Sequence, residues 1–432
     1  MQKTKYNKNQ LLYIIEAALE YFISIVVAGS FLATLTTQIG FSDSLTGILS
    51  SIISLGGLFQ LVSMFIRRRK IKRFVVIFSA LNQLLFAFLY VVPFFSLSED
   101  LKRIIFVVAI ILAYFVYNVV HPKKVNWMMS LVDNGIRGSF TANKEIVSLV
   151  GGMVFTFLMG NVVDFFKAKG EIETAFIICG TTIFILMVGH TLSMLLTDEV
   201  EKIAPSQSKK LFSQIGEVFK NKSLQKITFL FIMWHIVTGI AEPFNSVYMI
   251  KELRLSLTFI SVLGILQAII RVLCSRALGK YADKNSFAKM LRICFVFAFL
   301  GFLAVTVAFP TNKGINLLGY NLTYGKIACI IHFATHGIAM AGINSALINL
   351  IFDYVPFDTR SDSLAVTQSL SGLAGFISTF IAGLLVNYIQ QNGNSFLSLT
   401  IYAQQVLNLM AATITVGIML FLQFGIINKE KK

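Results

Sequence analysis

Two glutamates, Glu16 and Glu20, lie inside a long apolar stretch near the amino terminus. Residues four apart share one face of a helix, so the two carboxylates are expected to lie side by side. With ~1.5 Å of rise per residue, Glu20 would lie about 13 Å into a membrane-spanning helix that starts near Leu11. A charge at that depth costs ~3 kcal/mol or more, which makes both glutamates candidates for binding a solute or carrying a proton. In the alternative interpretation, Glu16 lies at the inner membrane surface and pairs with a basic loop.

Later apolar stretches carry His235, Glu242 and Arg271. His235 and Glu242 are seven apart, two turns along one helix face, and Pro243 is expected to interrupt the helix beside Glu242. Arg271 lies about 12 Å into its helix, where it could pair with a glutamate of the first helix or bind an anionic group. The alternatives are that Glu242 reaches only the outer vestibule and that Arg271 extends to the inner surface.

Lys123 and Lys124 follow Pro122, and their environment depends on where the fourth helix ends. If it ends at Pro122, both are ordinary cytoplasmic lysines. If it continues, one lysine faces the interior, with Tyr117, Asn118 and His121 one to two turns away. The second interpretation would favour a solute with an anionic group, and the sequence leaves the two equally open.

His332 and His336 share a helix face, but no further ligand residue clusters near them, so we expect hydrogen-bonded or cavity-lining histidines and no metal site. The cysteines lie in apolar runs without metal-ligand spacing and are expected to pack as small apolar residues. No cofactor is predicted. Other polar groups that could line a cavity or join helices are Gln267, Gln368, Asn344, Asn82 and Gln83.

The composition explains why these polar residues are unusual. Of the 432 residues, 56% are hydrophobic and only 13% are charged, about half the charged share of a soluble domain. The sequence therefore predicts an all-α membrane protein with about twelve transmembrane helices. The expected spans are 11–37, 44–66, 74–95, 103–132, 145–168, 173–196, 226–250, 255–280, 290–309, 323–352, 363–390 and 399–425.

The net charge of +16 is explained by the distribution of basic residues between the spans. If the amino terminus is cytoplasmic, 26 Lys and Arg residues fall in inner segments and 8 in outer segments. This bias predicts that both termini are cytoplasmic. The basic residues form no interleaved patch of the kind that binds nucleic acid, so no nucleic-acid partner is predicted.

An internal repeat predicts two halves. A shift of 223 residues aligns six identical pairs within one segment, and it also aligns Gly56 with Gly279. We therefore predict a six-helix bundle over 1–196, a cytoplasmic linker over 197–225 and a second six-helix bundle over 226–432. The six pairs are Arg137 with Arg360, Ala142 with Ala365, Ser148 with Ser371, Gly152 with Gly375, Thr156 with Thr379, and Gly160 with Gly383.

The residues around the predicted inner loops resemble the major facilitator superfamily. The stretch from Gly279 through Asp283 and Lys284 to Lys289 is similar to the Gly-x-x-x-Asp-Arg/Lys signature of that family, although Ser286 replaces the following glycine. The first-half copy after Gly56 has no aspartate. The segments that end at Arg137 and Arg360 resemble the family's other inner turns. The resemblance covers essentially the whole chain, and it implies a gating role for Gly279, Asp283, Lys284, Arg137 and Arg360.

The resemblance implies secondary active transport of a small organic solute by alternating access, as a symporter or antiporter, with protons as the candidate coupling ion. The sequence contains no nucleotide-binding loop and no catalytic constellation, so we expect neither an ATP-driven pump nor an enzyme. The chain is expected to act as a monomer in the plasma membrane, and a bacterial origin is expected. The alternatives are a multidrug/proton antiporter, which the absence of proline from 148–160 disfavours, and a non-transporting membrane sensor.

Overall fold

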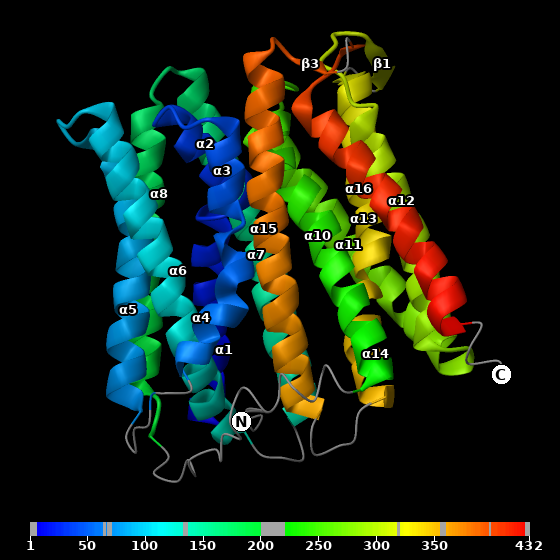
Figure 1. Ribbon diagram of the computed structural model, residues 1–432. Coiled ribbons are helices and arrows are strands. Elements are labelled where there is room, and N and C mark those ends of the chain that lie inside the picture. Colours follow the sequence, from blue (N-terminus) through cyan, green and yellow to red (C-terminus); the bar gives the residue numbers. More distant parts are fainter. Residues whose placement is uncertain are drawn as a thin grey trace. The chain divides into compact units, whose positions relative to one another are not determined.

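The computed structural model describes residues 7–63, 66, 71–132, 137–199, 221–317, 320–354, 360–396 and 399–427. Helices make up nearly all of these residues (Figure 1). Among them, 11 helices are long and apolar enough to cross a membrane. A helix satisfies its own backbone hydrogen bonds, which lipid cannot do. The predicted all-α membrane fold is confirmed. Most of the predicted linker, residues 200–220, lies outside the described residues.

The chain divides into two compact units. The first unit consists of residues 1–41 and 58–207. Its helices can be followed by their labels in Figure 1. They are α1 (Lys8–Val26), α2 (Gly29–Gln38), most of α4 (Gly56–Ser63), α5 (Lys72–Leu89), the short η2 (Val92–Phe94), α6 (Glu99–Ser130), α7 (Arg137–Ala168) and α8 (Ile172–Leu196).

The second unit consists of residues 42–57 and 208–432. Its first two elements come from residues 42–57, and all of its other elements follow the first unit in the sequence. The elements are α3 (Asp43–Ser50), η1 (Ile52–Leu55), α10 (Lys222–Lys251), α11 (Leu257–Lys284), α12 (Phe287–Thr306), β1 (Gly314–Leu317), β2 (Tyr320–Thr323), α13 (Tyr324–Met340), α14 (Ile343–Tyr354), α15 (Arg360–Gln391), β3 (Ser395–Phe396), β4 (Leu399–Thr400), α16 (Ala403–Leu422) and η5 (Gln423–Ile427).

Two predicted spans are not single helices. The span predicted at 11–37 breaks between α1 and α2, where Gly29 has a φ of 52°. The span predicted at 44–66 divides into α3, η1 and α4. The Ser50 and Ser51 hydroxyls bond to the carbonyls of Thr46 and Ile48, and such back-bonding competes with regular helix geometry. The span predicted at 44–66 is therefore not among the 11 long apolar helices of the described residues, where about twelve were predicted.

The sequence also missed smaller departures from straight helices. The span predicted at 323–352 is divided into α13 and α14 near Gly342. A Cβ on Gly342 would lie 2.5 Å from the Cys294 sulfur, so a larger residue there would require the Cys294 side chain to move. Two short antiparallel hairpins, β1–β2 and β3–β4, lie at the same end of the second unit (Figure 1). Strands this short produce no periodic signal in a sequence.

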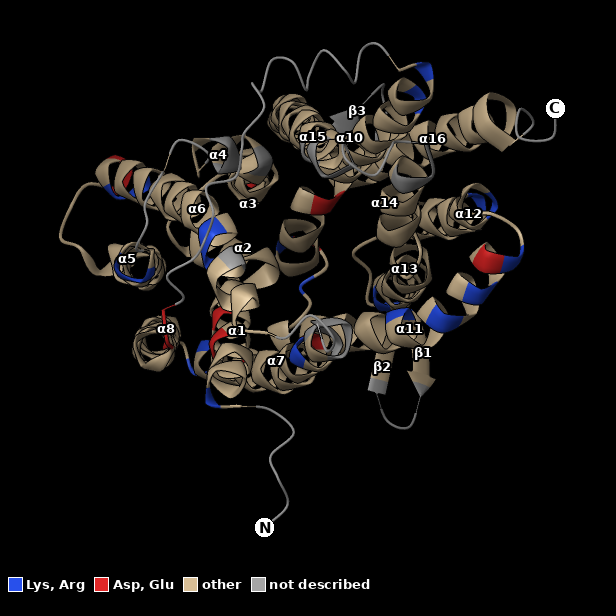
Figure 2. Cartoon of the chain, turned by 90° about the horizontal axis from the view of Figure 1, so that it is seen from below, with Lys and Arg blue, Asp and Glu red and all other residues tan. Residues whose placement is uncertain are grey.

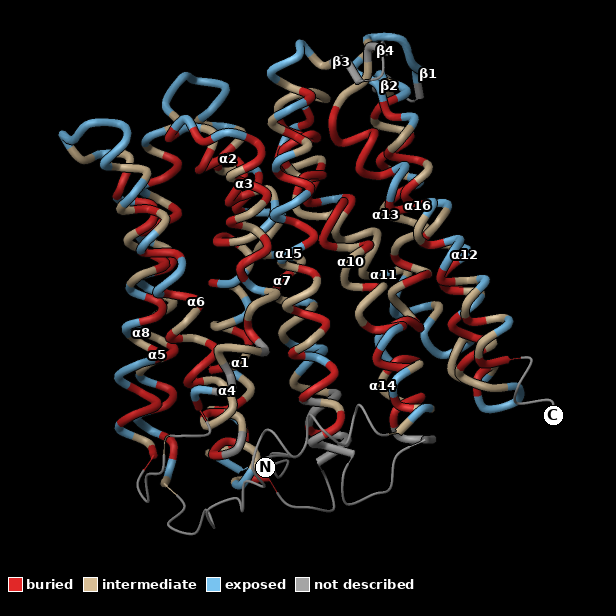
Figure 3. The backbone as a smooth tube through the Cα atoms, viewed as in Figure 1, coloured by how far each residue is buried: buried red, intermediate tan, exposed pale blue. Residues whose placement is uncertain are grey.

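The interior of each unit is apolar, and so is much of its exterior. Buried and exposed positions alternate along the helices (Figure 3). In the first unit, Ile77, Leu84, Ile177 and Ile185 are exposed on α5 and α8. Exposed apolar faces of this size favour contact with lipid. Three of the four cysteines are buried and all four are free thiols, as expected of packing residues.

The repeat has a structural counterpart in helix packing. In the first unit, a Cβ on Gly152 of α7 would collide with Tyr21 of α1, at 2.3 Å. In the second unit, Gly375 of α15 lies against the backbone of His235 on α10. Gly152 and Gly375 are one of the aligned pairs, and each allows the same kind of close helix approach in its own unit.

Residues 42–57 pack tightly within the second unit, although they come from the first half of the sequence. Asp43 of α3 forms an ion pair with Lys251 of α10, at 2.5 Å, and accepts a hydrogen bond from Gln390 of α15. A Cβ on Gly372 of α15 would lie 2.2 Å from the backbone oxygen of Ser54. The segment is therefore held by charge at one end and by backbone contact further along.

The close contact at Gly372 gives a testable stability difference. Gly372→Ala places a methyl group against a backbone oxygen that cannot turn aside, and such overpacking costs about 1–3 kcal/mol. Thermal unfolding of the purified protein in detergent should therefore begin at a lower temperature. Gly264→Ala is the matched control, because Gly264 is also helical and a Cβ there would meet no atom within 4 Å. Equal unfolding temperatures for the two variants would contradict this packing.

Candidate functional site

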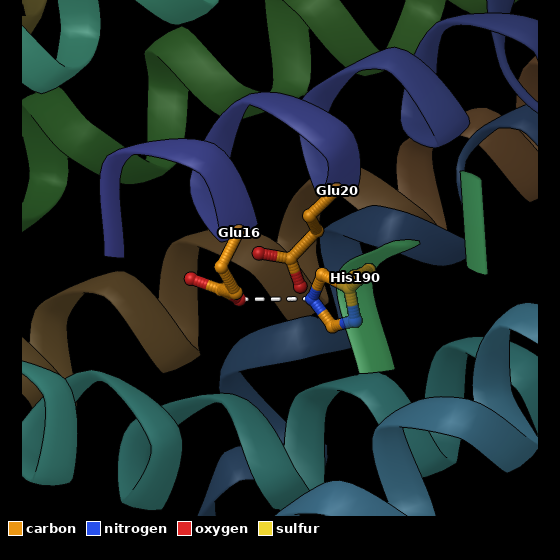
Figure 4. Close-up of side chains that lie close together, drawn as sticks. All are labelled: Glu16, Glu20 and His190. Carbon is orange, nitrogen blue, oxygen red and sulfur yellow. Dashed lines mark hydrogen bonds and ion pairs between the residues drawn. The ribbon is translucent and has the colours of Figure 1, made fainter. Parts of the chain in front are cut away.

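A buried ion network joins three helices of the first unit. The Lys124 ammonium on α6 lies 2.6 Å from Glu16 Oε1 and 2.5 Å from Glu20 Oε2, both on α1. The imidazole of His190 on α8 lies 2.9 Å from the same Glu16 oxygen. Figure 4 shows Glu16 and His190 joined across the space between their helices, with Glu20 beside them. Residues far apart in the sequence thus form one charged cluster.

The position of Lys124 follows from the length of α6. The helix continues through Pro122 to Ser130, so the interpretation that ended it at Pro122 is wrong. Trp127, one turn beyond Lys124, is fully buried, and its indole nitrogen donates to the Asp198 carbonyl at the end of α8. Lys124 is 3% exposed, whereas Lys123 is only half-buried. The two lysines therefore have different environments, and only Lys124 belongs to the network.

The imidazole of His190 has one partnered and one unpartnered ring nitrogen. Its Nε2 faces the Glu16 carboxylate, which can only accept, so Nε2 carries the hydrogen. Its other nitrogen, Nδ1, is buried and has no hydrogen-bond partner among the described residues. With the imidazole counted as neutral, the cluster holds two negative charges and one positive charge.

Glu20 is the open end of the cluster. Its side chain is 20% exposed, compared with 1% for Glu16 and 4% for Lys124. Oxygen and nitrogen atoms of Glu16, Glu20 and His190 lie within 4.8 Å of one another, a spacing that could hold a metal ion. The Lys124 ammonium already bonds to both carboxylates. A metal ion would therefore have to displace the chain's own cation.

Other predicted residues of α6 line up beside the network. The Tyr117 ring lies 5.0 Å from the His121 ring, and both groups are within electrostatic range of Glu20 and Lys124. The Asn118 side chain donates to the Tyr114 carbonyl of its own helix. Tyr117 and His121 therefore border the charged cluster, whereas Asn118 is occupied by a local bond.

A second polar cluster forms in the second unit from Glu242 on α10, Gln267 on α11 and His336 on α13. His336 Nε2 lies 3.0 Å from Glu242 Oε1, but the two atoms are not aligned for a hydrogen bond. The Gln267 amide nitrogen lies 2.9 Å from the other ring nitrogen of His336. The ring of His332 stacks parallel to that of His336 at 5.6 Å and bonds through Nδ1 to the Gly301 carbonyl.

Two predicted residues stand apart from this cluster. His235 bonds through Nδ1 to the Phe231 carbonyl of its own helix rather than to Glu242. Pro243 lies within α10, which runs from Lys222 to Lys251 without the predicted break. Arg271 is exposed on α11, and no described ion pair includes it. Glu16 and Glu20 both pair with Lys124. The expected pairing of Arg271 with a glutamate of the first helix stays a prediction.

The predicted gating residues are only partly described. Basic residues gather on α11, with an acidic residue near its end (Figure 2). There Gly279 is half-buried, and both Asp283 and Lys284 are exposed. The side chains of Arg137 and Arg360, at the starts of α7 and α15, lie outside the described residues. The gating role of these residues stays a prediction.

Sequence reasoning missed His190, the third partner of the network. The signal was present, because a histidine in the most apolar part of an expected span needs a polar partner. The periodicity of α8 does not indicate which helix supplies that partner.

A separate apolar groove of about 650 Å³ lies between α5 and α8 and is lined by Leu84, Phe88, Tyr90, Phe176 and Phe184. It contains no charged side chain and does not include the network.

Long apolar helices define the described part of the chain as a polytopic membrane protein. The sequence matches the Major Facilitator Superfamily over residues 17–379, and the chain belongs to that family. No curated protein matches it.

Several solved transporters share its fold. The nucleoside transporter NupG is 13% identical with a TM-score of 0.70, over 96% of this chain and 98% of that chain. A D-xylose-proton symporter is 13% identical with a TM-score of 0.67, over 96% of each chain. A POT family peptide transporter is 12% identical with a TM-score of 0.66, over 97% of each chain. At these identities the likeness concerns the fold alone.

The ion network predicts that replacing Lys124 lowers the stability of the protein more than replacing Lys123. Lys124→Met leaves two buried carboxylates without a cation, a change that costs about 3–5 kcal/mol in buried pairs. The unfolding temperature in detergent should fall well below that of Lys123→Met. Combining Lys124→Met with Glu16→Gln and Glu20→Gln should recover most of the loss, because no unpaired charge remains. Equal unfolding temperatures for the two lysine variants, or no recovery in the triple variant, would contradict the network.

Proposed function

We propose that this protein is a secondary active transporter that moves a small organic solute across the plasma membrane by alternating access. The observation that carries the proposal is the buried network of Glu16, Glu20 and Lys124. Stability alone does not require ionic groups there, because apolar side chains of similar volume are commonly at least as stabilising. A charged group deep in a span is by default a hypothesis of function. The network is proposed as the solute-binding site.

Family membership supports the same proposal. Transport requires no bond chemistry, and the described residues assemble no nucleophile with an activating base. The basic residues are distributed so that both termini are proposed to be cytoplasmic, and the chain is proposed to act as a monomer without a cofactor. The solutes of the similar structures differ widely, from nucleosides to xylose and peptides, so they do not define the solute of this chain.

We propose that protons drive the transport and that Glu242 and His336 carry them. The two groups are at ion-pair distance without hydrogen-bond alignment, so a change of protonation breaks no aligned bond. The Glu242 side chain is 38% exposed, whereas its Oε1 atom beside His336 is buried. The Gln267 amide can turn to offer either its nitrogen or its oxygen to His336, so it can follow either protonation state.

The first test of this function is uptake into proteoliposomes from a panel of solutes, with and without a pH gradient. We expect gradient-driven uptake of at least one solute class. Lys124→Gln should reduce this uptake at least tenfold, because it removes the cation that holds both carboxylates. Lys123→Gln is the control and should retain most of the uptake, since Lys123 is only half-buried and outside the network. No flux of any solute, with the protein folded and correctly inserted, would rule out a transporter and favour a membrane sensor.

The proton-carrying role of Glu242 predicts a separation of two transport modes. Glu242→Gln cannot release a proton, so accumulation driven by a pH gradient should fall at least tenfold. Exchange of labelled for unlabelled solute across the same membrane should persist, because exchange requires no net proton movement. Loss of both modes would place Glu242 in solute binding, and retention of both would remove it from the mechanism. Glu252→Gln, just beyond the end of α10, serves as the control.

A further inference from the structure

The charges of the network in the first unit do not balance. Glu16 and Glu20 contribute two negative charges and Lys124 contributes one positive charge, with His190 counted as neutral as in the formal charge of the chain. The next cation, Lys144, lies over the Tyr13 ring at 5.0 Å and forms no described ion pair with either carboxylate. Among the described residues, one negative charge is therefore left without a counter-charge in a largely apolar region, where such a charge is costly.

The excess charge is located at Glu20. One oxygen of Glu16 is contacted by both Lys124 and His190, and the residue is almost completely buried. Glu20 shares the ammonium of Lys124 and has no other ion-pair partner among the described residues. It is also the one acidic member with substantial exposure. An incoming ligand can thus reach Glu20 while the bonds that hold Glu16 remain in place.

We propose that the solute carries a protonated amine and that this ammonium binds Glu20. This inference rests on the proposed function and names the solute class of the same site. A single positive charge makes the network neutral, whereas a divalent metal ion would leave an excess of positive charge. Carboxylates accept N–H bonds, so an amine that retains a hydrogen fits better than a quaternary ammonium.

Lys124 has a defined role in this arrangement. Its ammonium is a tethered counter-ion that holds the Glu20 carboxylate in place before the solute arrives. It also explains why an anionic solute fits poorly, since the two carboxylates already occupy this cation. The sequence-based expectation of an anionic solute assumed a lysine without partners.

The test uses the full chain in proteoliposomes and three groups of probe solutes. The groups are the amines tyramine, putrescine and agmatine, the neutral solutes xylose and uridine, and the anions lactate and succinate. We expect transport of at least one amine and none of the anions. Glu20→Gln should lower amine uptake at least tenfold, because it removes the charge that the amine binds. Glu173→Gln, an exposed carboxylate at the start of α8, is the matched control and should leave uptake unchanged.

A binding measurement keeps the test independent of turnover and of damage by mutation. The transported amine should raise the unfolding temperature of the wild-type protein, and this rise should be absent in Glu20→Gln. Transport restricted to neutral or anionic probes, or an amine response that is unchanged in Glu20→Gln, would overturn the inference while leaving the transporter assignment intact. Absence of flux for every probe group would overturn the proposed function and the inference with it.

Discussion

The ion pair between Lys124 and the two glutamates of α1 is the interaction that constrains how three helices of the first unit pack. An ammonium buried in an apolar region is stable only with its counter-charges in direct contact. This requirement fixes α6 against α1, and the imidazole of His190 adds α8 to the same contact. It also explains why α6 continues past Pro122, since a helix that ended there would release Lys124 from its partners. The helix length and the electrostatics are thus two consequences of one constraint.

The two units share their packing but not their chemistry. Gly152 and Gly375 allow the same close helix approach in their own units, as the 223-residue register predicts. The register places Gly239 opposite Glu16 and Leu347 opposite Lys124, so the charged network has no copy in the second unit. There the polar groups are Glu242, Gln267 and His336; Glu242 lies at ion-pair distance from His336, and Gln267 lies at hydrogen-bond distance from the same ring. A charge network in one unit and a carboxylate–imidazole pair in the other would allow the proposed solute binding and the proposed proton binding to use separate groups.

Much of the fold could be predicted from the sequence because lipid imposes simple rules. Apolar length located the spans, and the i,i+4 spacing of Glu16 and Glu20 placed both carboxylates on one helix face. The partners of these groups could not be predicted in the same way. Whether Lys124 is buried, and that His190 completes the cluster, depends on helix packing that no local pattern encodes. The interruption of the span at 44–66 and the packing of residues 42–57 within the second unit are tertiary effects of the same kind.

The imbalance of charge connects these observations to transport. A network with equal charges would be satisfied without a ligand and would gain little from binding one. A network with one excess negative charge is less stable when empty, and binding a cation removes the cost. The chain limits this cost by exposing Glu20 while burying Glu16, so that the uncompensated charge stays near solvent. The same exposure gives a ligand access to Glu20. Solvent stabilises the Glu20 charge while the site is empty, and an ammonium group must replace that solvation when it binds.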